Sequence, residues 1–385
     1  MARGIPVAWL QLGREPLRLL VGLAGVAFAV ILVFMQLGFR SAMYESATRY
    51  HRSLDYDLVL LSPKTPFIGI PRAFTRRRLY QAFGADGVSS VSAVYIQQAF
   101  WKNPWGRGVR NIVVVGIDPT RRAFLLADVQ RQLAEIRLPD VVLFDARSRP
   151  EFGPVAEHLA RGDTVNAEIN DRHLSVGGLF ELGTSFGIDG TLVTSDLNFR
   201  RVFPDRAAGA INLGLIQLAP GADLYDVRGR LERALEDDVL VLTRAEFIDR
   251  EVRYWGSTTP IGYVFGFGAI MGMIVGAVIV YQILFADVSQ HLREYATLKA
   301  MGYSNRFLSN VVLQEAAILA ALGYVPGLVV TFGLYRLTAD ATRLPLELSG
   351  GRVVVVLALT LAMCGGAALM ALRKVHSADP AEVFG

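Results

Sequence analysis

Four long apolar segments constrain this chain more than any other feature. They span Leu19–Phe39, Ile261–Ala286, Val311–Tyr335 and Val353–Leu372. A run of about 20 apolar residues is long enough for a helix to cross a bilayer. The first segment continues through Val30–Phe34, beyond the short apolar core of a cleaved signal peptide, so it indicates a retained transmembrane helix. The sequence therefore predicts a membrane protein with four transmembrane α-helices.

Between the first two segments, the composition becomes that of a soluble domain. The whole chain has 19% charged residues, below the roughly 25% of soluble domains, but the charges concentrate in residues 40–257. Strand-like runs bounded by Gly, Pro, Asp or Asn lie at Asp57–Leu61, Val88–Trp101, Asn111–Ile117, Val141–Phe144, Leu174–Leu182, Thr191–Thr194, Ile211–Leu218 and Val239–Thr243. Helical patterns lie at Thr75–Phe83 and Asp223–Glu236. We predict a large α+β domain, a split αβ unit with an insertion at about residues 119–208.

Basic residues near the ends of the spans predict the orientation. One side would carry Arg3, Arg14, Arg18, Arg293, Lys299, Arg306, Arg373 and Lys374, and the short loop on the other side Arg336, Arg343 and Arg352. Positive charge is enriched on the cytoplasmic side, so both termini are expected inside and the large domain outside. The expected parts are an amphipathic N-terminal helix (1–16), transmembrane helices (17–39, 258–286, 311–335 and 353–372), an extracytoplasmic domain (40–257), a cytoplasmic connector (287–310), an outer loop (336–352) and a cytoplasmic tail (373–385).

The motifs of common enzymes are absent from the sequence. No G-x-x-x-x-G-K-[ST], H-E-x-x-H, G-x-S-x-G or C-x-x-C occurs, and the five histidines are scattered over different segments. The single cysteine, Cys364, lies in an apolar segment. A net charge of +4 is too small and too dispersed to indicate nucleic acid as a partner. We therefore predict no catalytic, cofactor-binding or metal-binding residue and no enzymatic activity on this chain.

Small and polar residues within the spans have two interpretations each. Gly268, Gly272 and Gly276 form one stripe of a helix, and small residues at this spacing let helices approach closely in lipid. The stripe predicts packing within the chain or against a second copy of it. Polar residues near the inner ends of the spans are anchors at the membrane interface or part of a translocation path, and they are Gln282, Gln314 and Glu315.

The connector between the second and third spans has the pattern of a capped amphipathic helix. Val288, Leu292 and Tyr295 fall on one helical face, with Leu298 close to it. Gly302 is placed to end this helix and Ser304 to cap the next one. Such a helix inserts into the groove of a partner protein or rests on lipid, and Arg293 and Lys299 stay available to solvent or to an acidic partner.

The segment Leu292–Ser304 (LREYATLKAMGYS) resembles the E-x-(A/G)-x-L-(K/R)-A-(M/L)-G-(A/Y)-(S/T) segment of FtsX/MacB-like ABC transporter permeases, most closely the DevC branch of heterocyst-type exporters. Further similarities to that branch lie at Ala8–Leu12, Phe34–Phe39, Val176–Gly183 and Asp379–Glu382. The resemblance implies a large outer domain built on a MacB-like periplasmic core with an inserted subdomain. It also implies a multi-pass inner-membrane protein that forms homodimers.

The resemblance further implies which partners drive the protein. ATP and Mg would be bound by a separate ABC ATPase subunit, and the connector would be its coupling segment. The implied contact residues are Val288, Leu292, Arg293, Glu294, Tyr295, Leu298, Lys299, Met301, Gly302, Tyr303, Asp379 and Pro380. Export would proceed by mechanotransmission through a periplasmic membrane fusion protein and a TolC-like outer-membrane channel. The alternative is a non-transporting transmitter that activates a periplasmic hydrolase, as in the cell-division branch.

Overall fold

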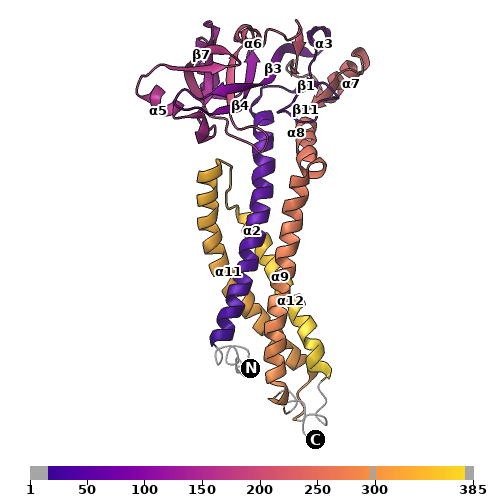
Figure 1. The fold of residues 1–385 in the computed structure, drawn as a ribbon. Helices are drawn as coiled ribbons and strands as arrows, with labels where there is room; N and C mark the ends of the chain where they lie inside the picture. Colours follow the sequence, from indigo (N-terminus) through magenta and orange to yellow (C-terminus); the bar gives the residue numbers. More distant parts are fainter. Residues whose placement is uncertain (1–15, 295–296, 298–300, 378–385) are drawn as a thin grey trace. The chain divides into compact units, whose positions relative to one another are not determined.

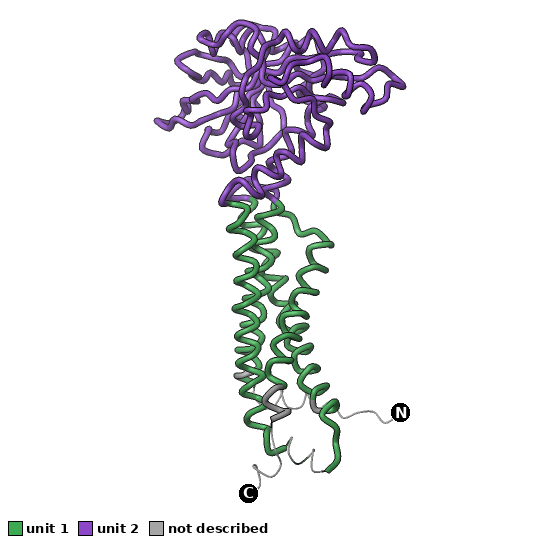
Figure 2. Tube along the Cα trace, turned by 90° about the vertical axis from the view of Figure 1, so that its right-hand side faces the viewer, with its two compact units in different colours: residues 1–41, 261–339, 346–385 green, residues 42–260, 340–345 purple. Residues whose placement is uncertain are grey.

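The computed structural model describes residues 16–294, 297 and 301–377 (Figure 1). It divides into two compact units, shown in different colours in Figure 2. The helical unit comprises residues up to Ser41, Ile261–Ala339 and residues from Leu346 onward. The sheet unit comprises Ala42–Pro260 and Asp340–Pro345.

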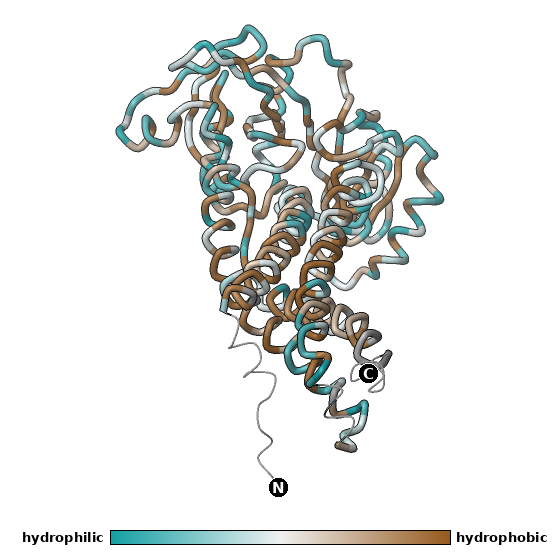
Figure 3. The backbone as a smooth tube through the Cα atoms, turned by 60° about the horizontal axis from the view of Figure 1, so that its bottom comes forward, coloured by the Kyte–Doolittle hydropathy of each residue, from teal (hydrophilic) through white to brown (hydrophobic). Residues whose placement is uncertain are grey.

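Four long helices form the helical unit. They are α2 (Pro16–Ser53), whose last turns belong to the sheet unit, α9 (Pro260–Gln290), α11 (Asn305–Thr342) and α12 (Gly350–Ser377). All four are long and apolar enough to cross a membrane, and apolar residues dominate their traces in Figure 3. Helix α2 continues well beyond the predicted span because residues 40–53 contain no proline or glycine to stop it. Loss of apolarity ended the predicted span, but it does not end a helix.

Helix α2 is packed closely by two of its neighbours within the helical unit. A Cβ added at Gly25 would lie 2.4 Å from Ile279 of α9, and one at Gly323 of α11 would lie 2.6 Å from Val26. Val26 and Phe34 of α2 are fully buried in a core that includes residues of α9, α11 and α12. Close approach of helix backbones at small residues is the packing mode expected in lipid.

The sheet unit is built on one nine-stranded sheet. Its order is β11 (Leu240–Thr243), β1 (Leu58–Leu61), β10 (Leu213–Leu218), β3 (Val88–Lys102), β4 (Val109–Ile117), β8 (Thr191–Ser195), β5 (Val141–Asp145), β7 (Arg172–Phe180) and β6 (Val165–Ile169). The pairs β4–β8 and β5–β7 are parallel, and the other neighbours are antiparallel. A second, two-stranded sheet pairs β2 (Phe74–Thr75) with β9 (Ala210–Ile211).

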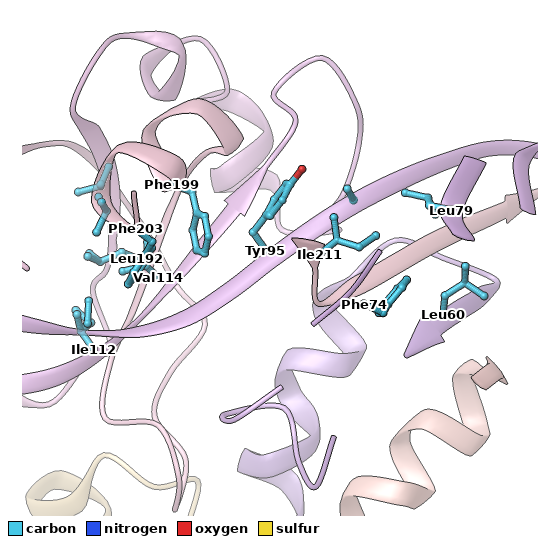
Figure 4. Close-up of a cluster of buried hydrophobic side chains, with 14 of the residues drawn as sticks. Leu60, Phe74, Leu79, Tyr95, Ile112, Val114, Leu192, Phe199, Phe203 and Ile211 are labelled. Carbon is cyan, nitrogen blue, oxygen red and sulfur yellow. The ribbon is translucent and has the colours of Figure 1, made fainter. Parts of the chain in front are cut away.

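Helices connect these strands and supply both layers of the core. They are α3 (Arg76–Phe83), α4 (Ala127–Arg131), α5 (Val155–Ala160), α6 (Asp196–Val202), α7 (Leu224–Ala234) and α8 (Arg244–Arg253), which continues into the π-helix η3 (Tyr254–Thr258). Alternate residues of a strand face opposite sides of a sheet. Tyr95 therefore packs with Phe199 in one core layer (Figure 4), whereas Val94 and Ile96 belong to the other.

The predicted fold class is confirmed as four long apolar helices and a large α+β domain. The strand-like runs of the sequence correspond to strands of the main sheet, except that β6 has no predicted counterpart. The proposed insertion at about residues 119–208 forms no separate sheet. Its strands β5 to β8 extend the main sheet, because β8 pairs with β4.

Candidate functional site

Most of the described side chains of the connector between α9 and α11 are exposed. Arg293, Glu294 and Tyr303 are exposed, and Met301 is 63% exposed despite being apolar. Leu292 is half-buried. A large apolar side chain that is open to solvent on a short connector is available for contact with a partner.

The ends of the connector have the capping geometry that the sequence predicts. Gly302 adopts a φ of 92°, the left-handed conformation that favours glycine after a helix. The backbone N–H of Phe307 donates to the hydroxyl of Ser304 over 3.4 Å, at the start of α11. The rings of Tyr303 and Phe307 lie 4.9 Å apart. Together these contacts fix where the chain turns back into α11.

Val288 differs from the other expected contact residues, because its side chain is fully buried in the helical core. A residue with no exposed surface cannot touch a partner, so Val288 anchors the connector instead. Beside it lie Asp287, with 5% exposure, and the fully buried Glu315, whose carboxyl group interacts with that of Asp287. The Nδ1 atom of His291 lies 3.0 Å from the Asp287 carbonyl oxygen.

Several expected site residues lie outside the described part of the chain. They are Tyr295, Leu298, Lys299, Asp379 and Pro380, together with the N-terminal helix at residues 1–15. Of the three polar residues that the sequence singles out near the inner ends of the spans, Gln282 and Gln314 are exposed and Glu315 is buried. Glu315 is therefore covered by other residues of the helical unit.

The glycine stripe of α9 is covered by the chain itself. A Cβ at Gly268 would lie 2.5 Å from the side chain of Gln36, and one at Gly272 would lie 3.2 Å from Leu32. At Gly276, the nearest atoms belong to Met363 and Ala29, at 2.4 and 2.5 Å. The stripe therefore packs α9 against α2 and α12.

A buried polar cluster in the sheet unit joins the end of α2 to the segment before α9. Glu251 of α8 lies 3.3 Å from the Nε2 atom of His51 at the end of α2. Its carboxylate also accepts hydrogen bonds from the backbone N–H of Ile68 at 3.1 Å and from Nε1 of Trp255 at 3.0 Å. We call this cluster the His51–Glu251 link. Sequence reasoning missed it, because its two halves are separated by most of the domain.

Within the described residues, no group of three His, Cys, Asp or Glu side chains is arranged to hold a metal ion. The two features that stand out are the exposed connector and the His51–Glu251 link, where the chain leaves α2 and approaches α9.

A comparison with protein families finds a match for the C-terminal part of the chain. Residues 266–380 match the family model described as FtsX-like permease C-terminal. No curated protein matches the sequence.

Among solved structures, the chain is similar to the periplasmic region of MacB from Actinobacillus actinomycetemcomitans, with a TM-score of 0.34 and 10% identity over 50% of this chain and 90% of that one. It is also similar to the extracellular domain of the noncanonic ABC-type transporter YknZ from Gram-positive bacteria, with a TM-score of 0.32 and 12% identity over 49% of this chain and 99% of that one. The matched residues 266–380, which hold most of α9, the connector, α11 and α12, are therefore similar to an FtsX-like permease C-terminal domain, and the match covers less than half of the chain.

Proposed function

We propose that this chain is the permease subunit of an ATP-driven ABC exporter of the mechanotransmission type, of the DevC-like branch. The observation that carries the proposal is the match of residues 266–380 to the FtsX-like permease C-terminal family. The sequence has no phosphate-binding loop, so ATP and Mg are bound by a separate ATPase subunit. Closure of that subunit on ATP displaces the transmembrane helices, and the sheet unit moves in response.

The remaining partners follow from the same proposal. The protein lies in the inner membrane with both termini in the cytoplasm, and the sheet unit is periplasmic. Two copies form the permease, and the sheet units dock a membrane fusion protein that leads to a TolC-like outer-membrane channel. The positive residues at the ends of the spans support this orientation.

The exposed connector is the surface that meets the ATPase subunit. Met301 and Tyr303 supply apolar contact area, and Arg293 and Glu294 supply charge beside it. A ligand or partner shifts a conformational equilibrium only when it binds the two states with different affinities. The connector must therefore bind the open and the closed ATPase dimer unequally.

Single-cysteine variants test both the orientation and the contact. Cys364 is the single natural cysteine and is buried, with 1% exposure. Its replacement by serine leaves an introduced cysteine as the only thiol in the chain. Met301→Cys should resist a membrane-impermeant maleimide until the inner membrane is permeabilised. Tyr225→Cys in the sheet unit, a matched position with 70% exposure, should react from the outside. The opposite labelling pattern would contradict the orientation.

Crosslinking then identifies the partner. Met301→Cys, carrying a photoreactive group, should capture an ABC ATPase subunit, whereas Tyr225→Cys should not. Tyr303→Ala should abolish the response of ATP hydrolysis to the assembled permease while membrane insertion is retained. An unchanged response in both Tyr303→Ala and Met301→Asp would refute the coupling surface. Copurification of a peptidoglycan hydrolase without a fusion protein would favour the non-transporting alternative.

A further inference from the structure

The long strand β3 has an interruption on one of its two edges. On one side it pairs with β4 continuously from Val94 to Lys102. On the other side it pairs with β10 as far as Val94 and with β6 only at Trp101 and Lys102. The stretch Tyr95–Phe100 therefore pairs with no strand on that edge in the described chain.

Side chains occupy only part of this open edge. The Asn212 side chain accepts a hydrogen bond from the Ile96 N–H at 2.8 Å, and Asn170 accepts one from the Phe100 N–H at 3.0 Å. Alternate residues of a strand direct their backbone groups to the same edge. The groups left over between these two contacts are the carbonyl of Ile96 and the N–H and carbonyl of Gln98. Unpaired strand edges are templates for another extended chain.

A pocket of about 320 Å³ lies at this edge. One wall is the loop of residues 69–73 and the other is the Ile96–Gln98 stretch of β3, with Arg206 and Asn212 completing the lining. The loop is held in place by hydrogen bonds from Gln98 to the Gly69 carbonyl and from Asn212 to the Pro71 carbonyl. The size falls in the range of about 300–1,000 Å³ that is typical of ligand pockets.

Arg206 brings an uncompensated positive charge to the pocket. Its hydrogen-bond acceptors are all neutral: Gln97 Oε1 at 3.1 Å, Asn212 Oδ1 at 2.5 Å and the Ala210 carbonyl at 3.4 Å. None of the contacts of Arg206 among the described residues is with a carboxylate, and no carboxylate lines the pocket. Burial lowers the pKa of Arg206, which reflects the cost of holding this charge without a counter-ion. A second arginine, Arg72, lies in the pocket wall.

We propose that the open edge of β3 binds an extended peptide segment with an acidic side chain, which pairs with Gln98 through its backbone and with Arg206 through its carboxylate. Addition of a strand to an exposed edge is a common mode of peptide recognition, in which backbone bonds give affinity and side-chain pockets give selectivity. A hydrogen bond between an arginine and a carboxylate is charge-assisted and roughly twice as strong as one between neutral groups. The exposed Ile70, at 47%, offers apolar contact to a neighbouring residue of the peptide.

This inference concerns the sheet unit alone and does not depend on the proposed export function. Binding to the full-length protein in detergent micelles can be measured with acetylated random pentapeptide mixtures whose central residue is fixed. Mixtures with a central Glu or Asp should bind at least about 10-fold more tightly than those with Gln or Lys, a difference of about 1.4 kcal/mol. Proline on either side of the acidic residue should weaken binding by a similar factor, because proline removes the backbone donor.

Variants place the effect on the pocket. Arg206→Gln should remove the preference for acidic peptides. Ile70→Glu should also remove this preference, because it puts a carboxylate into the pocket beside Arg206. Ile70 is exposed, so this change should leave the contacts of Asn212 intact. Arg107→Gln, the same change of charge at an exposed turn, is the control and should bind as the natural protein does. If Arg206→Gln misfolds, Ile70→Glu decides the test. Equal binding of Glu, Gln and proline-containing mixtures, or an unchanged preference in Ile70→Glu, would overturn the proposal.

Discussion

Replacement of Glu251 by alanine should destabilise the sheet unit strongly, because three buried groups contact the Glu251 carboxylate. The N–H of Ile68 and Nε1 of Trp255 would lose their acceptor, and His51 would lose its partner. A buried donor left without an acceptor costs about 1–3 kcal/mol. The two N–H groups alone therefore predict about 2–6 kcal/mol. The free energy of unfolding of a native domain is only about 5–15 kcal/mol, so this loss would be a large share of it.

The measurement is urea unfolding of the full-length protein in mild detergent, followed by tryptophan fluorescence. Glu251→Gln keeps one acceptor oxygen and nearly the same volume, so its loss should be about half as large. Glu232→Ala is the matched control, because Glu232 is 48% exposed and its ion pair with Arg228 is worth at most about 1 kcal/mol. A Glu251→Ala variant as stable as the Glu232→Ala variant would refute the assignment of the His51–Glu251 link as a structural joint.

Three further predictions concern other parts of the chain. Gly276→Leu should destabilise the helical unit by about 1–3 kcal/mol in thermal unfolding, because even a Cβ at this position would lie 2.5 Å from the Cβ of Ala29 in α2. Gly266→Leu is the control and should be tolerated, because a Cβ there meets nothing within 4 Å. Arg172 donates a hydrogen bond to Asp140 and lowers the pKa of that carboxyl group. The pair therefore stabilises the fold above the ordinary pKa of about 4, and this contribution is lost as the pH falls through the lowered pKa. Asp140→Asn should flatten the acid dependence of the urea midpoint. Asp223→Ala should cost about 1 kcal/mol of unfolding free energy, because the Asp223 side chain caps α7.

The proposed coupling surface and the open edge of β3 lie in different units, so their tests are independent. Loss of coupling in Tyr303→Ala should leave the acidic-peptide preference unchanged. Ile70→Glu, in the sheet unit, should lose the acidic-peptide preference and keep the coupling to ATP hydrolysis. A variant in one unit that abolished both properties would indicate a loss of folding and not of a specific contact, which the urea midpoint would reveal.

Local features of this chain were readable from the sequence, because their causes lie within a few neighbouring residues. The spans follow from the length of apolar runs, and the strands from β-branched runs bounded by turn residues. Asp223 and Gly302 occupy the capping positions that their residue types favour. Even the error at α2 had a local origin, since its helix continues through polar residues that the apolar pattern could not mark.

Only the tertiary structure decided which distant segments meet. It placed β8 beside β4, so that residues predicted to form an insertion extend one sheet. It brought His51 to Glu251 across two hundred positions of sequence, and it buried Val288 although the helical pattern placed it on a contact face. These outcomes depend on the packing of whole elements against each other, where burial and pairing of polar groups decide among arrangements that the local pattern allows equally. The sequence by itself determined most of the helices and strands, whereas the open edge of β3 and the position of Arg206 beside it exist only in the assembled sheet.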